Sequence, residues 1–387
     1  MKKQKCNFIV LCNLYTYIFL VCSSLIDKLP LAKNYEISYM HRETLTHVLS
    51  SKDLVITASI EGVVKFWKKN NVGALDFIKS FRAHSSPLTA IALSSDGCWL
   101  STGSFDKTIK IFDVENFDMI EILKYDEIVG HLLWWKSELF NSFRLIVANK
   151  IESLDDSVLE TDSPIAAPLS KPFLTVFDPW NSTSKTLSES ITTFMKDDTE
   201  ENFPVISTWC LNSATNILVI GTDDFRIRYL LIRDTAESNS IQLEDMTPHS
   251  SNHLSDFKSE SGIVSGISFS PDSRLFVTMS SDRFIRVFDF DSGKMVKKLD
   301  DRITVYSDAQ QSGSLPVKLD DLEFGRRLAI ERDLQRSPYF NDLKAIFDQS
   351  SQFIIFPSLI GIKIMNLESN RLVRLLSRED SLRPLQI

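Results

Sequence analysis

The residues of this sequence that could do chemistry are histidines and carboxylates, and their spacing supports little of it. His249 and His253 stand four positions apart, as a metal-binding pair on a helix would, but Pro248 and the neighbouring serines predict a loop. The acidic stretch 197–201 has no glycine at the turn, unlike a Ca²⁺-binding loop, and we expect it to be solvated. The chain also contains no H-E-x-x-H, G-x-S-x-G, P-loop or G-x-G-x-x-G motif. The sequence therefore predicts no catalytic, cofactor or metal site.

The elements that must position any functional side chain are short β-strands, which are clearest in residues 84–113. Apolar and polar residues alternate in Leu88–Leu93 and again in Ile109–Phe112. Turns that contain Asp96-Gly97 and Asp106 separate these runs. Alternation with period two, interrupted by such turns, predicts antiparallel strands that each bury one face.

This unit recurs along the chain. The segments Glu61–Trp67 and Asp282–Asp289 repeat its turn and closing strand, and weaker copies bring the number of closing strands to six. The six strands end near Trp67, Phe112, Phe177, Leu230, Phe288 and Met365. A period of roughly 40–45 residues, with four short strands in each unit, is typical of a β-propeller. We therefore predict an all-β fold, a propeller with six recognisable blades or an incomplete ring of seven.

The repeated unit resembles a WD repeat. In that family a histidine hydrogen-bonds the turn aspartate, and a serine or threonine and the closing tryptophan extend the network. His41 and His84 stand about twenty residues before the turn acids Glu61 and Asp106, so the resemblance implies a structural role for both histidines. The residues assigned to this blade network are His41, Glu61, Trp67, His84, Asp106, Phe112, Asp224, Asp282 and Phe288. Because Phe112 has no indole donor, part of the rigidity of its blade must come from packing.

Residues 1–29 are expected to lie outside the propeller, which would occupy residues 30–387. Lys2, Lys3 and Lys5 precede an uncharged, largely apolar run at 8–26. This pattern fits a signal peptide or a short membrane anchor, or else an atypical start without a targeting role. Polar segments near 151–172, 181–202 and 234–260 cannot bury apolar surface and are predicted to be loop insertions.

A further insertion, near 300–340, is predicted to contain one helix at about 319–336. Leu319, Leu322, Ile330 and Leu334 fall at near-helical spacing and would form the apolar face of an amphipathic helix. The adjacent Arg326 and Arg327 would then form a basic point on the helix, either a solvated face or a candidate contact for a phosphate or an acidic partner. The alternatives are a helix that binds a partner and a helix that only covers one edge of the propeller.

Composition excludes several classes of protein. The chain has 387 residues, a formal net charge of −8 and a pI near 5.4, which argues against non-specific nucleic-acid binding by its whole surface. We therefore predict no direct nucleic-acid contact. Five cysteines occur without a C-x-x-C spacing, so neither a disulfide framework nor a zinc ribbon is indicated.

Longer segments carry a closer resemblance, to the peptidylprolyl isomerase domain and WD repeat-containing proteins, which are spliceosome-associated nuclear cyclophilins. It extends over about 29–387, and the segment 322–332 is its most specific part. The segments concerned are Ser38–Glu43, Ile56–Ser59, Val64–Lys69, Phe112–Met119, Leu322–Arg332 and Leu359–Arg371. Members of the family join an N-terminal propeller to a C-terminal cyclophilin domain. No residue here matches the cyclophilin catalytic arginine or its aromatic pocket, and the final blade is expected to lack strands.

The resemblance implies a non-catalytic protein-interaction scaffold that acts in pre-mRNA splicing complexes. It implies spliceosomal protein partners, a nuclear location, and a monomer within a larger complex, with no cofactor. The alternative function is peptidylprolyl cis–trans isomerisation, if the full-length gene product carries the cyclophilin domain. The alternative location is a membrane or the secretory pathway, if the segment 8–26 is a genuine signal.

Overall fold

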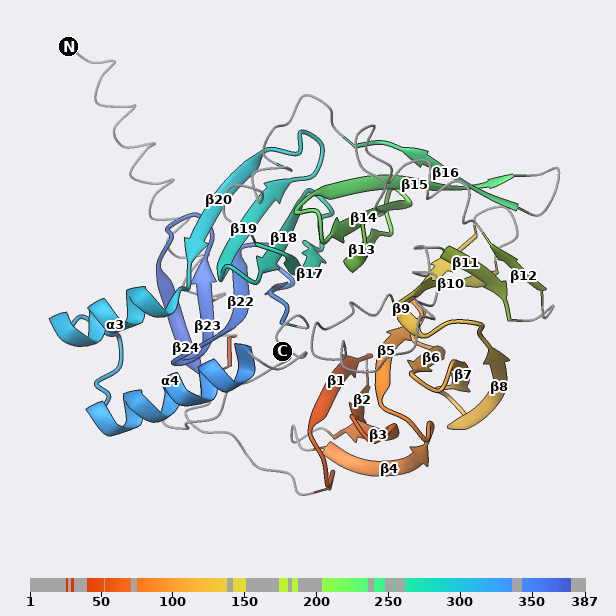
Figure 1. Ribbon diagram of the computed structural model, residues 1–387, viewed down its shortest axis with the longest axis horizontal. Coiled ribbons are helices and arrows are strands. Elements are labelled where there is room, and N and C mark those ends of the chain that lie inside the picture. Colours follow the sequence, from red (N-terminus) through yellow and green to blue (C-terminus); the bar gives the residue numbers. More distant parts are fainter. Residues whose placement is uncertain are drawn as a thin grey trace, which may run out of the picture.

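The computed structural model describes residues 26, 29–30, 40–51, 53–70, 75–137, 142–150, 174–179, 183–186, 204–235, 240–247, 254, 262–335 and 343–376. Within them the chain forms six antiparallel sheets of four strands, and each sheet is built from consecutive strands of the sequence. Figure 1 shows the sheets placed one after another around a common centre, as the blades of a propeller. The predicted all-β propeller with six blades is confirmed.

Each of the first three blades runs from an inner to an outer strand. Blade one comprises β1 (Leu45–Ser50), β2 (Leu54–Ser59), β3 (Val63–Lys69) and β4 (Leu75–Arg82). Blade two comprises β5 (Leu88–Leu93), β6 (Trp99–Ser104), β7 (Thr108–Asp113) and β8 (Asp118–Lys124). Blade three comprises β9 (Val129–Lys136), β10 (Phe143–Asn149), β11 (Leu174–Asp178) and β12 (Thr183–Thr186).

The other three blades have the same order. Blade four comprises β13 (Ile206–Asn212), β14 (Ile217–Thr222), β15 (Ile227–Thr235) and β16 (Ser240–Asp245). Blade five comprises β17 (Val264–Phe269), β18 (Leu275–Ser280), β19 (Phe284–Asp289) and β20 (Met295–Asp300). Blade six comprises β21 (Ile346–Phe347), β22 (Phe353–Ser358), β23 (Gly361–Asn366) and β24 (Leu372–Leu376). The expectation that the final blade would lack strands was therefore wrong.

The core lies between the blades. Five apolar clusters each join one blade to the next, from blades one and two to blades five and six. Between blades one and two, Phe66 packs against Phe112, and between blades four and five Tyr229 packs against Phe276. In β7, Ile109 and Ile111 pack towards blade three and Phe112 packs towards blade one, so this middle strand buries both faces and not the single face that the alternation predicted.

The outermost strands of blades three and four lie in segments that were predicted to be loops. The segments 181–202 and 234–260 were expected to be loops, but β12 pairs with β11 in the first of them, and β16 pairs with β15 in the second. These strands were missed because an outer strand covers little core, so its sequence need not be apolar: β12 reads TSKT and β16 reads SIQLED. The segment 151–172 lies outside the described residues.

The start of the chain also departs from the prediction. Leu29 is buried against Phe353 and Ile364 of blade six, and Ile26 packs beside them. The Arg374 guanidinium donates a hydrogen bond to the Ile26 carbonyl over 2.8 Å. Residues 26 and 29 therefore contribute to the propeller instead of lying outside it. The remainder of the run at 8–26 lies outside the described residues, and none of the described helices is long and apolar enough to cross a membrane.

Two helices follow blade five, where one was predicted. They are α3 (Ile303–Ser312) and α4 (Asp321–Gln335), and they lie side by side next to blade six (Figure 1). The helix predicted near 319–336 is α4, whereas α3 has no clear apolar stripe in its sequence. Gly313 ends α3 with a φ of +67°, the left-handed conformation that favours glycine at this position.

Candidate functional site

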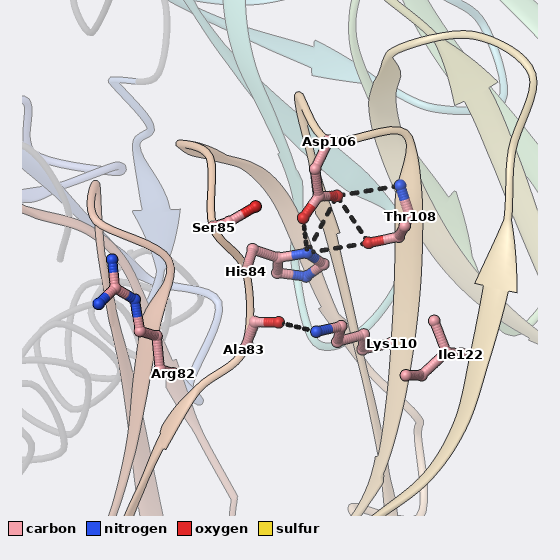
Figure 2. A pocket seen from close by; sticks show the side chains of 8 residues that line it. All are labelled: Arg82, Ala83, His84, Ser85, Asp106, Thr108, Lys110 and Ile122. Carbon is pink, nitrogen blue, oxygen red and sulfur yellow. Dashed lines mark hydrogen bonds and ion pairs between the residues drawn. The ribbon is translucent and has the colours of Figure 1, made fainter.

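The best-defined polar cluster lies where blade one passes into blade two. The link after β4 carries His84, and the β6–β7 turn carries Asp106 (Figure 2). Gly62 allows this approach: its backbone carbonyl accepts a hydrogen bond from the His84 amide over 3.1 Å. Gly62 has a φ of +79°, and a Cβ there would lie 2.6 Å from the His84 carbonyl oxygen, so glycine is needed for both reasons.

The cluster has the connectivity of an acid–histidine–hydroxyl triad. His84 Nδ1 donates to Asp106 Oδ2 over 3.0 Å, and His84 Nε2 lies 2.9 Å from Thr102 Oγ1. Thr108 also donates to Asp106, from its hydroxyl over 2.6 Å and from its amide over 3.0 Å. Figure 2 shows His84, Asp106 and Thr108 grouped at one side of an open cavity of about 560 Å³.

Burial decides what this triad can do. His84 is 2% exposed and Thr102 is fully buried, so no substrate can reach the Thr102 hydroxyl as a nucleophile requires. The triad instead satisfies buried polar groups that would otherwise destabilise the fold. Lys110 belongs to the same structure, since its ammonium donates to the Ala83 carbonyl.

The charges of the cluster follow from this burial. Burial lowers the pKa of His84, and the attraction of the Asp106 carboxylate opposes this shift only in part. Burial alone would raise the pKa of Asp106, but hydrogen bonds from Thr108 and the contact with His84 outweigh it and hold that pKa below its ordinary value. The resting pair is therefore a neutral histidine that donates to an ionised aspartate.

The pKa values of three other histidines are also lowered. Burial, with repulsion from Lys65, lowers the pKa of His41 to about 4. In the inner strands β1 and β9, burial and repulsion from Lys344 lower the pKa of His47 to about 3 and that of His131 to about 4. Each of these folded-state values lies below the unfolded value of 6.5, so the unfolded chain binds more protons in this range.

We therefore expect stability to be full above about pH 6.5 and to fall as the pH drops from 6.5 towards 4. Urea unfolding at pH 7.5, 6.0 and 5.0 should show a progressive loss of unfolding free energy. A His131→Asn variant should lose less over this range than the wild-type chain, because one titrating group is removed. If the free energy of unfolding did not change between pH 7.5 and 5.0, the inferred burial of neutral histidines would be contradicted.

Blade one contains a different version of the network. His41 Nε2 lies 2.8 Å from Thr57 Oγ1, and the indole of Trp67 donates to the same oxygen over 2.8 Å. Glu61 stands at the β2–β3 turn, but among the described contacts no hydrogen bond joins it to His41. The structure thus joins His41 and Trp67 through the Thr57 hydroxyl and leaves the turn acid Glu61 apart.

In blades four and five the turn aspartate pairs with an arginine of the closing strand. Asp224 is paired with Arg228 over 2.6 Å, and Asp282 is paired with Arg286 over 2.5 Å, each four residues on. Arg286 is buried, and its guanidinium also donates to the Ser280 hydroxyl over 2.7 Å. Phe288, the closing-strand aromatic of blade five, is fully buried and stacks on Phe276 with centroids 5.1 Å apart.

Sequence reasoning missed these arginines, although a signal for them exists. A basic residue occupies the middle of the closing strand in five blades, two positions before the closing side chain. These residues are Lys65, Lys110, Arg228, Arg286 and Lys363. In blades one and two the lysine donates to the carbonyl just before the histidine, at Met40 and at Ala83. In blade six Lys363 contacts buried Asp301 over 2.9 Å.

The two arginines of α4 have opposite environments. The Arg326 side chain is 74% exposed, with Glu323 3.8 Å away. Arg327 was expected to be a surface contact for a partner, but it is only 4% exposed and its Nε donates to Glu323 over 3.1 Å. Arg327 therefore cannot meet a partner at the surface. The reason is that the helix turns this charged side towards the propeller.

The other residues considered for chemistry add no site. His249, His253 and the acidic stretch 197–201 lie outside the described residues. Among the residues that the structure does describe, no group of three or more His, Cys, Asp or Glu side chains could hold a metal ion.

Comparisons with known proteins agree with this architecture. The WD domain, G-beta repeat, matches residues 75–113 and 251–289. The β-propeller domain of Cps50 (Swd1) from Myceliophteria thermophila superposes with a TM-score of 0.53, covering 90% of this chain and 88% of that domain. Its sequence identity is 14%, so this likeness concerns the fold alone.

Two proteins with similar sequences are longer than this chain. Peptidylprolyl isomerase domain and WD repeat-containing protein 1 of Mus musculus is 31% identical over 378 residues, which are 94% of this chain and 51% of that protein. Peptidyl-prolyl cis-trans isomerase cyp15 of Rhizopus delemar is 32% identical over 358 residues, with 92% and 52% covered. This chain thus spans about half the length of these relatives. It is a WD-repeat β-propeller protein, related to the peptidylprolyl isomerase domain and WD repeat-containing proteins.

Proposed function

We propose that this chain is a non-catalytic protein-interaction scaffold that works within pre-mRNA splicing complexes in the nucleus. The observation that carries the scaffold role is the propeller itself, in which the one acid–histidine–hydroxyl cluster of the described residues is sealed from substrate. A rigid ring of blades presents loops and edges on which partners can bind. The splicing link is supported by the sequence resemblance to spliceosome-associated cyclophilins.

The proposed partners are spliceosomal proteins, bound by a monomer within a larger assembly. Direct nucleic-acid binding is not part of the proposal, because the chain is acidic overall, with a net charge of −8. Contacts in such an assembly would be made by exposed side chains of loops, outer strands and helices, of which a few would supply most of the binding energy.

The test is recovery of splicing assemblies by the intact chain. The tagged protein, expressed in nucleated cells, should enrich spliceosomal proteins from nuclear extract by at least about tenfold over an unrelated WD propeller of similar size. The unrelated propeller controls for contacts that any such fold would make. Equal recovery by the two proteins would contradict the splicing role, and absence of the chain from nuclei would contradict the location.

A second candidate function is peptidylprolyl cis–trans isomerisation, favoured by the names of the longer relatives. It is a proposal for a whole protein of their length. A proline-isomerisation assay separates the two functions: we expect this chain alone to give the uncatalysed rate, and acceleration proportional to its concentration would favour the second.

A further inference from the structure

Consecutive blades are held together in a regular way from blade one to blade six. An apolar cluster fills each of these five boundaries. From blade three onwards, a side chain of each inner strand also donates a hydrogen bond to a backbone carbonyl in or just before the inner strand of the next blade. These bonds run from His131 to Ile206 over 3.3 Å, from Ser207 to Val264 over 2.8 Å and from Ser265 to Leu343 over 3.1 Å.

The boundary between blade six and blade one, which are neighbours in the ring (Figure 1), is built differently. Each described sheet consists of consecutive strands, so no strand from the start of the chain completes blade six. Among the described residues, no apolar cluster contains side chains of both blades. The structure does record a repulsion between them: burial, and then the charge of Lys344 just before β21, lower the pKa of His47 in β1 to about 3.

The face of blade six that looks towards this boundary is covered by the start of the chain. Ile354 packs towards blade five, so the alternation along β22 turns Phe353 to the opposite side. There Leu29, only 8% exposed, packs against Phe353 and Ile364, which are both fully buried, and Ile26 packs beside them. Ile26 and Leu29, called the clasp from here on, thus occupy the place that a neighbouring blade fills at the other five boundaries.

Hydrogen bonds fix the clasp in this position. The Leu29 amide donates to the Ile26 carbonyl over 3.1 Å, so the two residues are one helical turn apart and present their side chains on the same side. The Arg374 guanidinium of β24 donates to the same carbonyl over 2.8 Å. The apolar contacts lie on β22 and β23. The clasp therefore contacts three of the four strands of blade six.

The clasp is also continuous with blade one. The chain that follows Leu29 leads into β1, which begins at Leu45, so a segment bound to blade six is covalently joined to blade one. The buried apolar set around the clasp is smaller than the clusters at the other boundaries. Because the least buried contact opens at the lowest free energy, this boundary is expected to be the weakest of the ring.

We propose that Ile26 and Leu29 form a releasable clasp that closes the ring between blade six and blade one, and that the ring opens first at this boundary. Release would uncover the apolar face around Phe353 and Ile364 and would loosen both bordering blades. The other boundaries would stay closed, because their apolar clusters and inner-strand hydrogen bonds do not involve the clasp.

Hydrogen exchange of backbone amides in the full chain tests this proposal. In the wild-type chain, the inner strand β1 should exchange faster than the inner strand β17, whose blade has closed boundaries on both sides. Leu29→Asp places a charge in the apolar contact and should release the clasp. We expect amides of both β23 and β1 to exchange at least about tenfold faster in this variant, while β7 and β19 keep their wild-type rates. The effect in β1 is decisive, because the described packing of Leu29 is with blade six.

Two further variants complete the test. Val296→Asp makes an apolar-to-acidic change at a valine of β20 that is 53% exposed, and it should leave all these exchange rates unchanged. Arg374→Ala removes the hydrogen bond to Ile26 and leaves the apolar contact. It should accelerate exchange in β23 and β1 in the same pattern as Leu29→Asp but to a smaller extent, and it decides the question if Leu29→Asp does not fold.

Three results would overturn the inference. Faster exchange confined to blade six would show that the clasp only packs on that blade and does not close the ring. Unchanged exchange in both β23 and β1 would show that neither blade depends on the clasp. A wild-type chain in which β17 exchanges as fast as β1 or faster would show that the ring does not open first between blades six and one.

Discussion

Replacing Glu331 with alanine is expected to lower the free energy of unfolding by about 3–5 kcal/mol. Glu331 is fully buried, and its carboxylate pairs with the buried guanidinium of Arg283. The variant would leave that guanidinium inside the protein without its anion, and an uncompensated buried charge is costly. The same change removes the ion pair between α4 and blade five, which joins residues 48 positions apart in the chain, and leaves the packing of Leu334 against that blade.

Urea unfolding followed by tryptophan fluorescence measures this effect. The matched control is the double variant Arg283→Met with Glu331→Leu, which removes both charges and keeps apolar volume, so it should recover most of the loss. Arg326→Ala, at an exposed arginine of the same helix, should change the unfolding free energy by less than about 0.5 kcal/mol. If Glu331→Ala cost no more than Arg326→Ala, the ion pair would not hold the helix.

The α4 helix shows where sequence reasoning reaches its limit. Its existence followed from the near-helical spacing of apolar residues, and the structure confirms a helix at Asp321–Gln335. The spacing accounts for its orientation only in part: Leu319 and Leu334 of the apolar stripe pack inwards, whereas Leu322 and Ile330 are exposed. Here the inside is decided by Arg283, a partner distant in sequence that makes it possible to bury Glu331. No local pattern in the helix reports such a partner.

The middle strands of the blades, in contrast, could be predicted well from the sequence. Strands such as β7 and β19 lie between two blades, so both their faces are packed and their apolar pattern is strong. They could be predicted, with their turns, from the sequence alone. Outer strands such as β12 and β16 contribute mainly backbone hydrogen bonds, which leave no apolar signature.

The candidate site was predictable to the extent that it follows the WD pattern. The positions of His84 and Asp106 were inferred from family resemblance, and the structure places them 3.0 Å apart. The arginines of blades four and five depart from that pattern, so the resemblance did not reveal them. The basic residue in the middle of the closing strand, four residues after the turn acid as Arg286 is after Asp282, could have suggested the pairing.

The largest apolar effect is expected at Phe112, which the sequence presents as a tryptophan position without its indole. In the structure its ring is fully buried, with its centroid 5.3 Å from that of Phe81 and 6.5 Å from that of Phe66. It therefore fills the boundary between blades one and two, in place of a hydrogen bond within its own blade. Phe112→Ala should lower the unfolding free energy by about 3–5 kcal/mol, since it removes a buried ring and leaves a cavity at a boundary that both blades share.

Met119 provides the matched control for this prediction. It pairs directly with Phe112 across β7 and β8 but is 44% exposed, so Met119→Ala should cost much less than the change at Phe112. Phe112→Leu should fall between the two, because it keeps part of the apolar volume. If Met119→Ala and Phe112→Ala had equal effects in urea unfolding, the stability of blade two would come from its own strand pairing. Rigidity in this propeller would then be a property of single blades, and the packing between blades would be secondary.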